Sequence, residues 1–394
     1  MMEIGHADRA RSGSRKSLTE RAICGELATM TRNHLVWLGW VLSCLTAADL
    51  AAAQHKSKKL IEFGWDEPDT AFLRQHLPEM EQTPFDGCVF HAGYELAGGR
   101  KGSFTWDSWS TNAFNEADVK EAFDDLKTLR PSRFKQNFLR FNTTPANLDW
   151  FDDHTAVLGN CRLAARLARA GKCPGLLFDI EQYNNPLFDY RKQRDAKTKS
   201  WEVYAAQVRR RGREVMEAFQ EGYPGLTIFL TFGYSLPWLE SGAGRGALAE
   251  CHYGLLAPFM DGLLEAARGK TRLVDGHEIS YGYKEAAQFI TAYQTMQSGL
   301  LPIVRDPERY HRSVSLGFGV WMDQDWRKHG WNVEDVSKNY FTPEAFEISV
   351  RAALTTADEY VWIYTETPRW WSEKGGMVQL PLAYAEALRR ARKE

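Results

Sequence analysis

The sequence predicts an α/β fold of the (β/α)8 TIM-barrel type, a single domain with long loops after its strands. Short apolar runs and amphipathic stretches alternate eight times along residues 54–394, and strict alternation of strand and helix predicts a parallel sheet. Eight such units in this length favour a closed barrel over an open sheet. Links before the strands are short, as at 130–136 and 171–174, whereas links after them are long, as at 182–200 and 324–341. In a barrel, the long links share the face where active sites form.

The predicted strands are short, rich in β-branched or aromatic residues, and bounded by Gly, Pro, Asn or Asp. They are residues 60–66, 87–91, 137–142, 175–181, 226–234, 272–277, 314–323 and 360–366.

Between these strands, apolar residues recur at spacings of three and four, which predicts helices. Thr342 followed by Pro343 is typical of an N-cap with proline in the first turn. Gly171 is a helix stop signal, and Asn115 is the expected cap of the helix that contains Val119.

Residues 1–53 are predicted to be a leader with a secretory signal. A basic start at Arg32 precedes an apolar run over 35–48, and Ala51 to Ala53 supply the small residues that a signal peptidase reads. The apolar run is short for a membrane span. We therefore expect a secreted or periplasmic catalytic domain at 54–394, with no membrane span in the mature chain. The net charge of −2 gives no reason to expect a nucleic-acid partner.

Four cysteines remain after this signal, namely Cys88, Cys161, Cys173 and Cys251. Their spacing contains no CxxC motif, so the sequence predicts neither a zinc site nor a redox motif, and it suggests no cofactor. Cys161 and Cys173 either form a disulfide in an oxidising compartment or remain buried thiols, and the sequence leaves both open.

Strand alternation predicts which side chains point to the barrel axis. In the fourth strand, Leu176, Phe178 and Ile180 are the helix-facing set, so Asp179 and Glu181 face the axis. The same argument, with Val274 taken as helix-facing, selects a largely polar set in the other strands. This set comprises Glu62, Gly64 and Asp66 of the first strand, His91 of the second, Arg140 and Asn142 of the third, Asp275 and His277 of the sixth, Trp321 and Asp323 of the seventh, and Trp362, Tyr364 and Glu366 of the eighth.

So many carboxylates along one axis indicate a function, because burying them costs several kcal/mol each unless they are paired. Hydrolysis of a glycosidic bond needs one carboxylic acid and a second carboxylate. Asp179 raises the pKa of Glu181 by repulsion between like charges. We assign Glu181 as the general acid and Asp179 as its supporting residue.

The second carboxylate is left open by the sequence among Asp275, Glu278, Asp323 and Glu366, where Glu278 lies just past the sixth strand. The remaining axis-facing residues are candidates for substrate binding. They are Asp66, His91, Arg140, Asn142, His277, Trp321, Asp323, Trp362 and Tyr364.

Tryptophans are frequent in the predicted loops after the strands. Such side chains either stack on the apolar faces of sugars or pack the loops onto the barrel rim. Their concentration on one predicted face favours a carbohydrate substrate. They are Trp106, Trp109, Trp326, Trp331, Trp370 and Trp371.

The segment that ends in Asp179-Ile180-Glu181 resembles the fourth-strand Asp-x-Glu of chitinase-like (family 18) barrel glycosidases. The resemblance implies that Glu181 is the acid and that Asp179 orients an acetamido group of the substrate. It also implies that Trp362 floors the site. Leu177 stands where the longer family pattern has another Asp. More broadly, the chain resembles barrel glycoside hydrolases, which predicts a secreted enzyme that cleaves poly- or oligosaccharides by carboxylate acid/base catalysis.

Two other functions fit the same residues. A metal-dependent barrel hydrolase would use His91, Asp179, Asp275 and His277 as ligands of a divalent ion. A non-catalytic carbohydrate-binding barrel would keep the aromatic surface but would not need Glu181.

Overall fold

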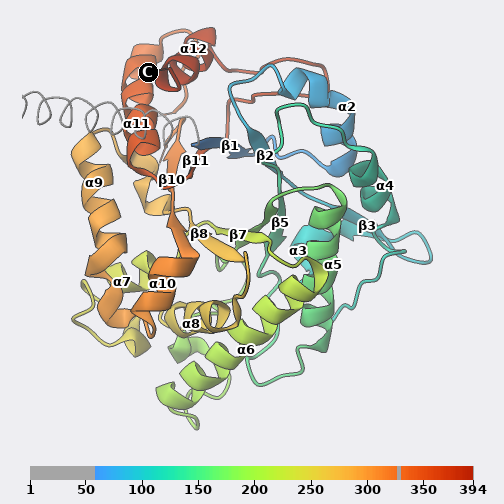
Figure 1. The fold of residues 1–394 in the computed structure, drawn as a ribbon, viewed down its shortest axis with the longest axis vertical. Helices are drawn as coiled ribbons and strands as arrows, with labels where there is room; N and C mark the ends of the chain where they lie inside the picture. The colour runs from blue at the N-terminus through green and yellow to red at the C-terminus, as the bar shows by residue number, and fades with distance from the viewer. Residues whose placement is uncertain (1–57, 326–329, 394) are drawn as a thin grey trace, which may run out of the picture. The chain divides into compact units, whose positions relative to one another are not determined.

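A computed structural model describes residues 58–325 and 330–393 of the chain. The predicted leader (residues 1–53) and Trp326 lie outside the described residues. In the described part, parallel strands form a nearly closed barrel, and helices surround it (Figure 1). The nine-stranded sheet has the order β10-β11-β1-β2-β5-β6-β7-β8-β9.

Each of the eight predicted strand regions contains at least one strand of this sheet, and the neighbours that pair along it are parallel. The strands are β1 (Lys59–Gly64), β2 (Gly87–Phe90), β5 (Phe138–Asn142), β6 (Gly175–Asp179), β7 (Thr227–Leu230), β8 (Arg272–Asp275), β9 (Val314–Leu316), β10 (Phe318–Trp321) and β11 (Tyr360–Thr365).

The two ends of the sheet order, β9 and β10, are separated in the chain by Gly317 alone. β9 pairs with β8, whereas β10 pairs with β11. The Gly317 amide donates to the Asp275 carbonyl at 2.7 Å, and a Cβ at Gly317 would lie 2.8 Å from the carbonyl oxygen of Tyr360. A glycine therefore lets the chain pass from one neighbour to the next where the sheet nearly closes.

Helices occupy every connection between successive strands of the barrel except the one at Gly317. The α-helices are α2 (Thr70–Met80), α3 (Phe104–Asp107), α4 (Lys120–Thr128), α5 (Thr155–Ala170), α6 (Trp201–Gly222), α7 (Ser235–Glu240), α8 (Leu256–Ala266), α9 (Ala286–Gln294), α10 (Pro307–Ser313), α11 (Pro343–Thr356) and α12 (Leu382–Ala391).

Short helical turns and a hairpin lie in the loops. The turns are η1 (Tyr190–Lys192), η2 (Leu248–Glu250), η3 (Glu278–Gly282), η4 (Thr295–Gly299), η5 (Leu301–Ile303) and η6 (Val336–Lys338). The long loop after β2 folds back as the antiparallel pair β3 (Gly93–Glu95) and β4 (Lys101–Ser103), which the sequence analysis did not predict.

Local signals set most of the predicted helix ends. The Thr342 side chain accepts a hydrogen bond from the Ala345 amide, which confirms the cap of α11. Gly171 is the C-cap of α5, as expected. The predicted Asn115 cap is wrong, because α4 begins later and Asn115 instead accepts a hydrogen bond from the Ala117 amide in a turn.

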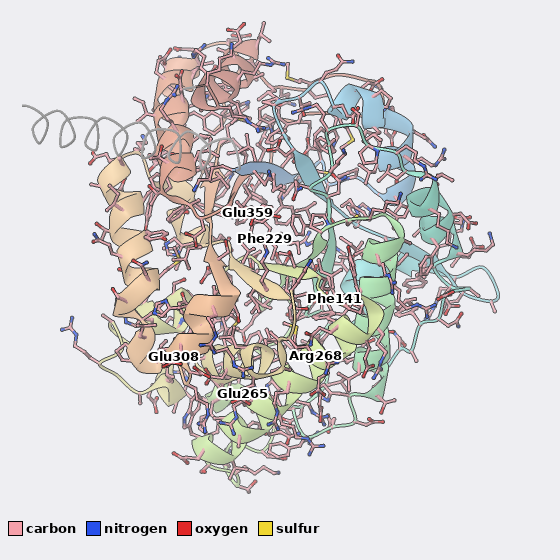
Figure 2. The ribbon with its side chains drawn as sticks, in the orientation of Figure 1. Phe141, Phe229, Glu265, Arg268, Glu308 and Glu359 are labelled. Carbon is pink, nitrogen blue, oxygen red and sulfur yellow. The ribbon has the colours of Figure 1, made fainter. Side chains whose placement is uncertain are left out.

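Apolar side chains fill both faces of the barrel wall. One buried cluster occupies the axis and the other packs between strands and helices. Phe229 of β7 belongs to the axial cluster, and Phe141 of β5 packs against Phe219 of α6 at 5.6 Å between ring centroids. Figure 2 shows Phe229 within the ring of strands and Phe141 toward the helices.

The parity predicted for the fourth strand is confirmed, because Leu177 lies in the axial cluster while Leu176 and Phe178 lie in the outer one. The parity predicted for the first strand is wrong. Ile61 and Phe63 belong to the axial cluster, so Glu62, Gly64 and Asp66 lie on the alternate side. The parity predicted for the sixth strand is also wrong. Val274 belongs to the axial cluster, whereas Leu273, which shares its side of the strand with Asp275, belongs to the outer cluster. The prediction failed because a barrel interior is itself packed with apolar residues.

Cys88, Cys161, Cys173 and Cys251 are all buried free thiols, so Cys161 and Cys173 do not pair. Within 58–325 and 330–393, no helix has the length and apolar character needed to cross a bilayer.

Candidate active site

A cleft opens at the carboxyl ends of the barrel strands. It has a volume of ≈ 770 Å³, which lies in the range of small-molecule and oligomer sites. Most strands of the barrel contribute to its walls, through their last residues or those after the strand end. It is lined by Phe63, Gly64, Trp65, Glu67, His91, Ser103, Trp106, Arg140, Glu181, Tyr183, Glu278, Tyr281, Trp321, Tyr364 and Glu366.

Arg140 and Asp179 form a buried ion pair at the base of this cleft. The guanidinium donates to Asp179 Oδ2 from Nε at 3.1 Å and from Nη2 at 2.6 Å. Its third nitrogen, Nη1, donates to Glu67 Oε2 at 2.8 Å. Burial lowers the pKa of Arg140, but the charges of Asp179 and Glu67 outweigh this and raise it overall. Arg140 is therefore an internal counter-ion, and each of its three guanidinium nitrogens donates to a side chain of the protein.

Aromatic rings enclose the same guanidinium. Its central carbon lies 5.1 Å from the ring centroid of Phe63 and 4.8 Å from that of Trp106, distances at which cation–π attraction operates. Trp106 in turn meets Tyr183 edge to face at 5.1 Å. Arg140 therefore links the charged base of the cleft to its aromatic wall.

Tyr183 joins the ion pair to Glu181. Its hydroxyl oxygen lies 3.1 Å from Asp179 Oδ2 and 3.0 Å from Glu181 Oε1, and it accepts a hydrogen bond from Arg140 Nη2 at 3.2 Å. The ring of Tyr183 is on the surface, with 46% of the residue exposed, while its hydroxyl points inward to the carboxylates. Asp179 Oδ1 accepts from the Glu181 amide at 3.1 Å, which fixes the backbone of the strand tip.

Glu181 and Glu278 lie close enough in the cleft to influence each other's charge. Burial, followed by the charge of Asp179, raises the pKa of Glu181 to about 8. Burial raises the pKa of Glu278 well above its ordinary value, and the charges of Glu181 and Asp179 add to the effect. Two such carboxyls lose their protons in separate steps that belong to the pair. Near neutral pH the pair therefore holds a proton that it can donate.

Glu366 lies on the cleft wall formed by β11 and the loop after β1. Its Oε1 accepts from the Tyr364 hydroxyl at 3.2 Å, and that hydroxyl accepts from Trp65 Nε1 at 2.9 Å. Burial, followed by the charge of Asp323, raises the pKa of Glu366. Tyr364 also stacks on Tyr281, with centroids 5.4 Å apart and planes at 17°, so carboxyls and flat aromatic surfaces alternate around the cleft.

The cleft brings together seven of the side chains selected from the sequence. They are His91, Arg140, Glu181, Glu278, Trp321, Tyr364 and Glu366. Asp179 is fully buried and stands behind this lining, with Oδ2 bonded to Arg140 and Tyr183 and Oδ1 to the Glu181 amide. It therefore supports Glu181, and the substrate contact implied by the chitinase-like resemblance does not fit its position.

Three further predicted residues hold the protein itself together. Asp66 Oδ2 accepts from the Trp370 amide at 2.6 Å. Asp323 accepts from Trp321 Nε1 at 3.0 Å and from the Glu366 and Thr367 amides. Trp362 is fully buried in the barrel axis and donates to the Gly276 carbonyl at 2.8 Å, so it does not floor the cleft.

Asp275 and His277 are placed on the other side of the barrel wall by the parity of β8. Asp275 is fully buried, and burial raises its pKa to about 6. His277 borders a separate apolar groove with Ser235, whose Oγ lies 3.3 Å from His277 Nδ1. Neither residue lines the cleft with Glu181, which corrects both assignments. Asn142 is also fully buried and outside the lining.

These positions separate the four residues of the metal-dependent alternative. His91 lines the cleft and Asp179 lies beneath it, whereas Asp275 and His277 lie behind the wall. Across the part of the chain that the structure describes, no group of three or more His, Cys, Asp or Glu side chains is arranged to hold a metal ion.

The tryptophans divide between the cleft and the protein interior. Trp106 lines the cleft, whereas Trp109, Trp370 and Trp371 are buried. Trp331 donates to the Gln379 carbonyl at 2.7 Å and packs on Tyr384. Most described loop tryptophans therefore anchor loops.

Sequence reasoning missed several cleft residues. Tyr183 continues the alternation of Asp179 and Glu181 by two more residues, so extending the parity past the strand would have found it. Glu67 follows the first strand directly, in a loop expected at the active face. Tyr281 lies in η3, after the strand has ended, and no periodic signal indicated it.

The comparisons with known proteins add no assignment. No protein-family model matches the chain, and no curated protein sequence matches it.

Proposed function

We propose that this protein is a secreted glycoside hydrolase built on a (β/α)8 barrel. In this interpretation β9 and β10 are one seventh strand, interrupted at Gly317 where it changes neighbours. Each remaining connection carries a helix, and the cleft lies at the strand ends where barrel enzymes place their chemistry. Export rests on the signal predicted from residues 1–53.

The observation that carries the proposal is the pair Glu181 and Glu278 in an aromatic cleft. Glycoside hydrolysis needs one carboxyl that is protonated at working pH and one that is not. Burial raises the pKa of both carboxyls, and because they lose their two protons in separate steps, one can be protonated while the other is ionised. We assign Glu181 as the acid, because a protonated Glu181 can donate to the Tyr183 hydroxyl while that hydroxyl donates to Asp179.

The reaction then follows from the positions of the groups. Glu181 gives its proton to the oxygen of the leaving sugar, and Glu278 stabilises the positive charge at the anomeric carbon, as nucleophile or as base toward water. Tyr281, Trp321 and Tyr364 present flat apolar surfaces for the sugar rings. Asp179 and Arg140 hold the acid from below without contacting the substrate.

A panel of poly- and oligosaccharides incubated with purified enzyme tests this function, with reducing-end release as the readout. We expect hydrolysis of at least one glycan and a loss of about 10³-fold or more in kcat for E181Q. Glu217→Gln, on the exposed face of α6, is the matched control and keeps wild-type activity. If E181Q hydrolyses glycans as fast as wild type, Glu181 is not the acid and the proposed mechanism fails. If wild type binds a glycan but hydrolyses none, the protein is a binding module and the proposed function fails.

A further inference from the structure

The Tyr183 hydroxyl has three polar neighbours but only one hydrogen. Arg140 Nη2 donates to its oxygen at 3.2 Å. Asp179 Oδ2 and Glu181 Oε1 lie at 3.1 and 3.0 Å, both within hydrogen-bond distance. The phenol can donate to only one of these two carboxyls at a time. The other contact is a hydrogen bond only if that carboxyl supplies the hydrogen.

Asp179 is the carboxyl of this set that faces a cation. Its Oδ2 already accepts two hydrogen bonds from the Arg140 guanidinium, which is a charge-assisted arrangement. The Tyr183 hydrogen therefore goes to Asp179, and the proton between Tyr183 and Glu181 belongs to Glu181. This is the one distribution of hydrogens in which each of the three contacts is a hydrogen bond.

We propose that Tyr183 is a positioning residue with two donor states: it donates to Asp179 while Glu181 carries its proton, and to Glu181 once that proton has been transferred. This inference rests on the proposed function for its use in catalysis, but the hydrogen-bond switch exists in the free enzyme. It requires rotation of one hydroxyl hydrogen and no movement of heavy atoms.

The proton balance of the step is closed. The Glu181 proton passes to the glycosidic oxygen, and the O–H bond of Tyr183 remains intact throughout. Its hydrogen turns from Asp179 Oδ2 to Glu181 Oε1, which stabilises the carboxylate left behind. Asp179 keeps both Arg140 hydrogen bonds and the Glu181 amide, so it tolerates the loss. When Glu181 recovers a proton, the hydroxyl turns back.

Carbon-13 NMR of the free enzyme tests the switch without a substrate. With aspartate labelled at Cγ and glutamate at Cδ, D179N and E181Q assign the two signals. In wild type, we expect the chemical shift of Asp179 Cγ to change with pH at the same midpoint as the chemical shift of Glu181 Cδ. In Y183F that linked shift should shrink by about half or more. Y364F, which removes the other cleft hydroxyl bonded to a glutamate, should retain it.

Persistence of the full linked shift in Y183F would mean that charge repulsion alone couples the two carboxyls, and the proposal would be overturned. A second measurement applies even if Y183F does not fold. In wild type, the chemical shift of Tyr183 Cζ should change with pH at the midpoint of the Glu181 titration. In E181Q, this chemical shift should no longer change over that pH range. A Tyr183 signal that ignores Glu181 also overturns the switch.

Kinetics separate this inference from the proposed function. Activated dinitrophenyl glycosides leave without an acid, whereas methyl glycosides need one. We expect Y183F to lower kcat at least about 10-fold on methyl glycosides and much less on dinitrophenyl glycosides. Y364F should affect both to a similar extent. If NMR shows the switch while wild type cleaves no glycoside, the proposed function fails and the switch stands.

Discussion

Arg140 donates two hydrogen bonds to a single oxygen of Asp179, Oδ2, at 3.1 and 2.6 Å. The pair is buried directly beneath Glu181, so one negative charge is held close to the candidate acid. This charge raises the pKa of Glu181, and the guanidinium keeps the Asp179 carboxylate in place. The acid therefore depends on a residue that the substrate does not reach.

Replacing Asp179 with Asn should separate the effect of the Asp179 charge on the pKa of Glu181 from its effect on the stability of the protein. Removing the charge lowers the pKa of Glu181, so the alkaline limb of kcat/KM should move to lower pH. The free energy of unfolding should fall by about 3 kcal/mol or more, because the buried Arg140 loses a partner. A pH–rate profile and denaturant unfolding measure the two. An unmoved alkaline limb would contradict the assigned role of Asp179.

Glu181 should make the folded protein less stable as pH rises. Its pKa is about 8 in the folded state and 4.5 ordinarily, so the folded state holds the proton more tightly. Stability is then full below about pH 4.5 and is lost as pH rises toward 8. E181Q should exceed wild type in stability by about 4 kcal/mol at pH 8 and by little at pH 4. Unfolding in urea at both pH values checks this, with Glu217→Gln as the control that changes neither.

Glu278 and Glu366 are the two remaining candidates for the second carboxylate, because Asp275 and Asp323 lie outside the cleft lining. We expect E278Q to lower kcat by about 10³-fold or more, since the charge coupling links Glu278 to Glu181. E366Q should act mainly on KM, because its carboxylate is bonded to Tyr364. Steady-state kinetics of both variants decide the assignment. The reverse pattern would identify Glu366 as the partner.

Trp106 should contribute binding affinity more than rate. Its ring lies over Arg140 and against Tyr183 at the cleft wall. W106A should raise KM roughly 3- to 10-fold with a smaller change in kcat, since a stacking contact is worth about 1 kcal/mol. W106F retains a flat ring and should recover most of the affinity. Equal losses in both constants for W106F would indicate a structural role instead.

Gly319 of β10 tests the packing of the barrel axis. A Cβ there would lie 2.7 Å from the Trp362 ring and 2.9 Å from Tyr281. G319A should therefore lower the free energy of unfolding by about 1–3 kcal/mol through overpacking. An added Cβ at Gly159 in α5 would meet no atom within 4 Å apart from its chain neighbours and the backbone of its own helix, so G159A should stabilise by about 0.5–1 kcal/mol. Thermal unfolding of both variants provides the comparison.

The eight strand regions, the alternation with helices and the candidate acid Glu181 were all predictable from the sequence. The periodicity of apolar residues and the polar residues at strand ends are local signals, because each depends only on residues that are close together in the chain. The fourth strand was predicted correctly because its two faces differ sharply, with Asp179 and Glu181 opposite Leu176 and Phe178.

Tertiary structure alone decided which carboxyl could meet Glu181. In β8, apolar residues face both the axis and the helices, so the apolar character of Val274 does not indicate which side it faces. A shift of one residue places Asp275 and His277 behind the wall. Glu278 reaches the cleft only because the chain leaves the strand and enters η3. Tyr183, Glu67 and Arg140 are far apart in sequence, and the pairing of β1, β2, β5 and β6 brings them to one charged network. The sequence by itself predicted a parallel barrel and the candidate acid, whereas long-range packing decided which carboxyls lie near that candidate, because only the folded barrel sets distances between the ends of different strands.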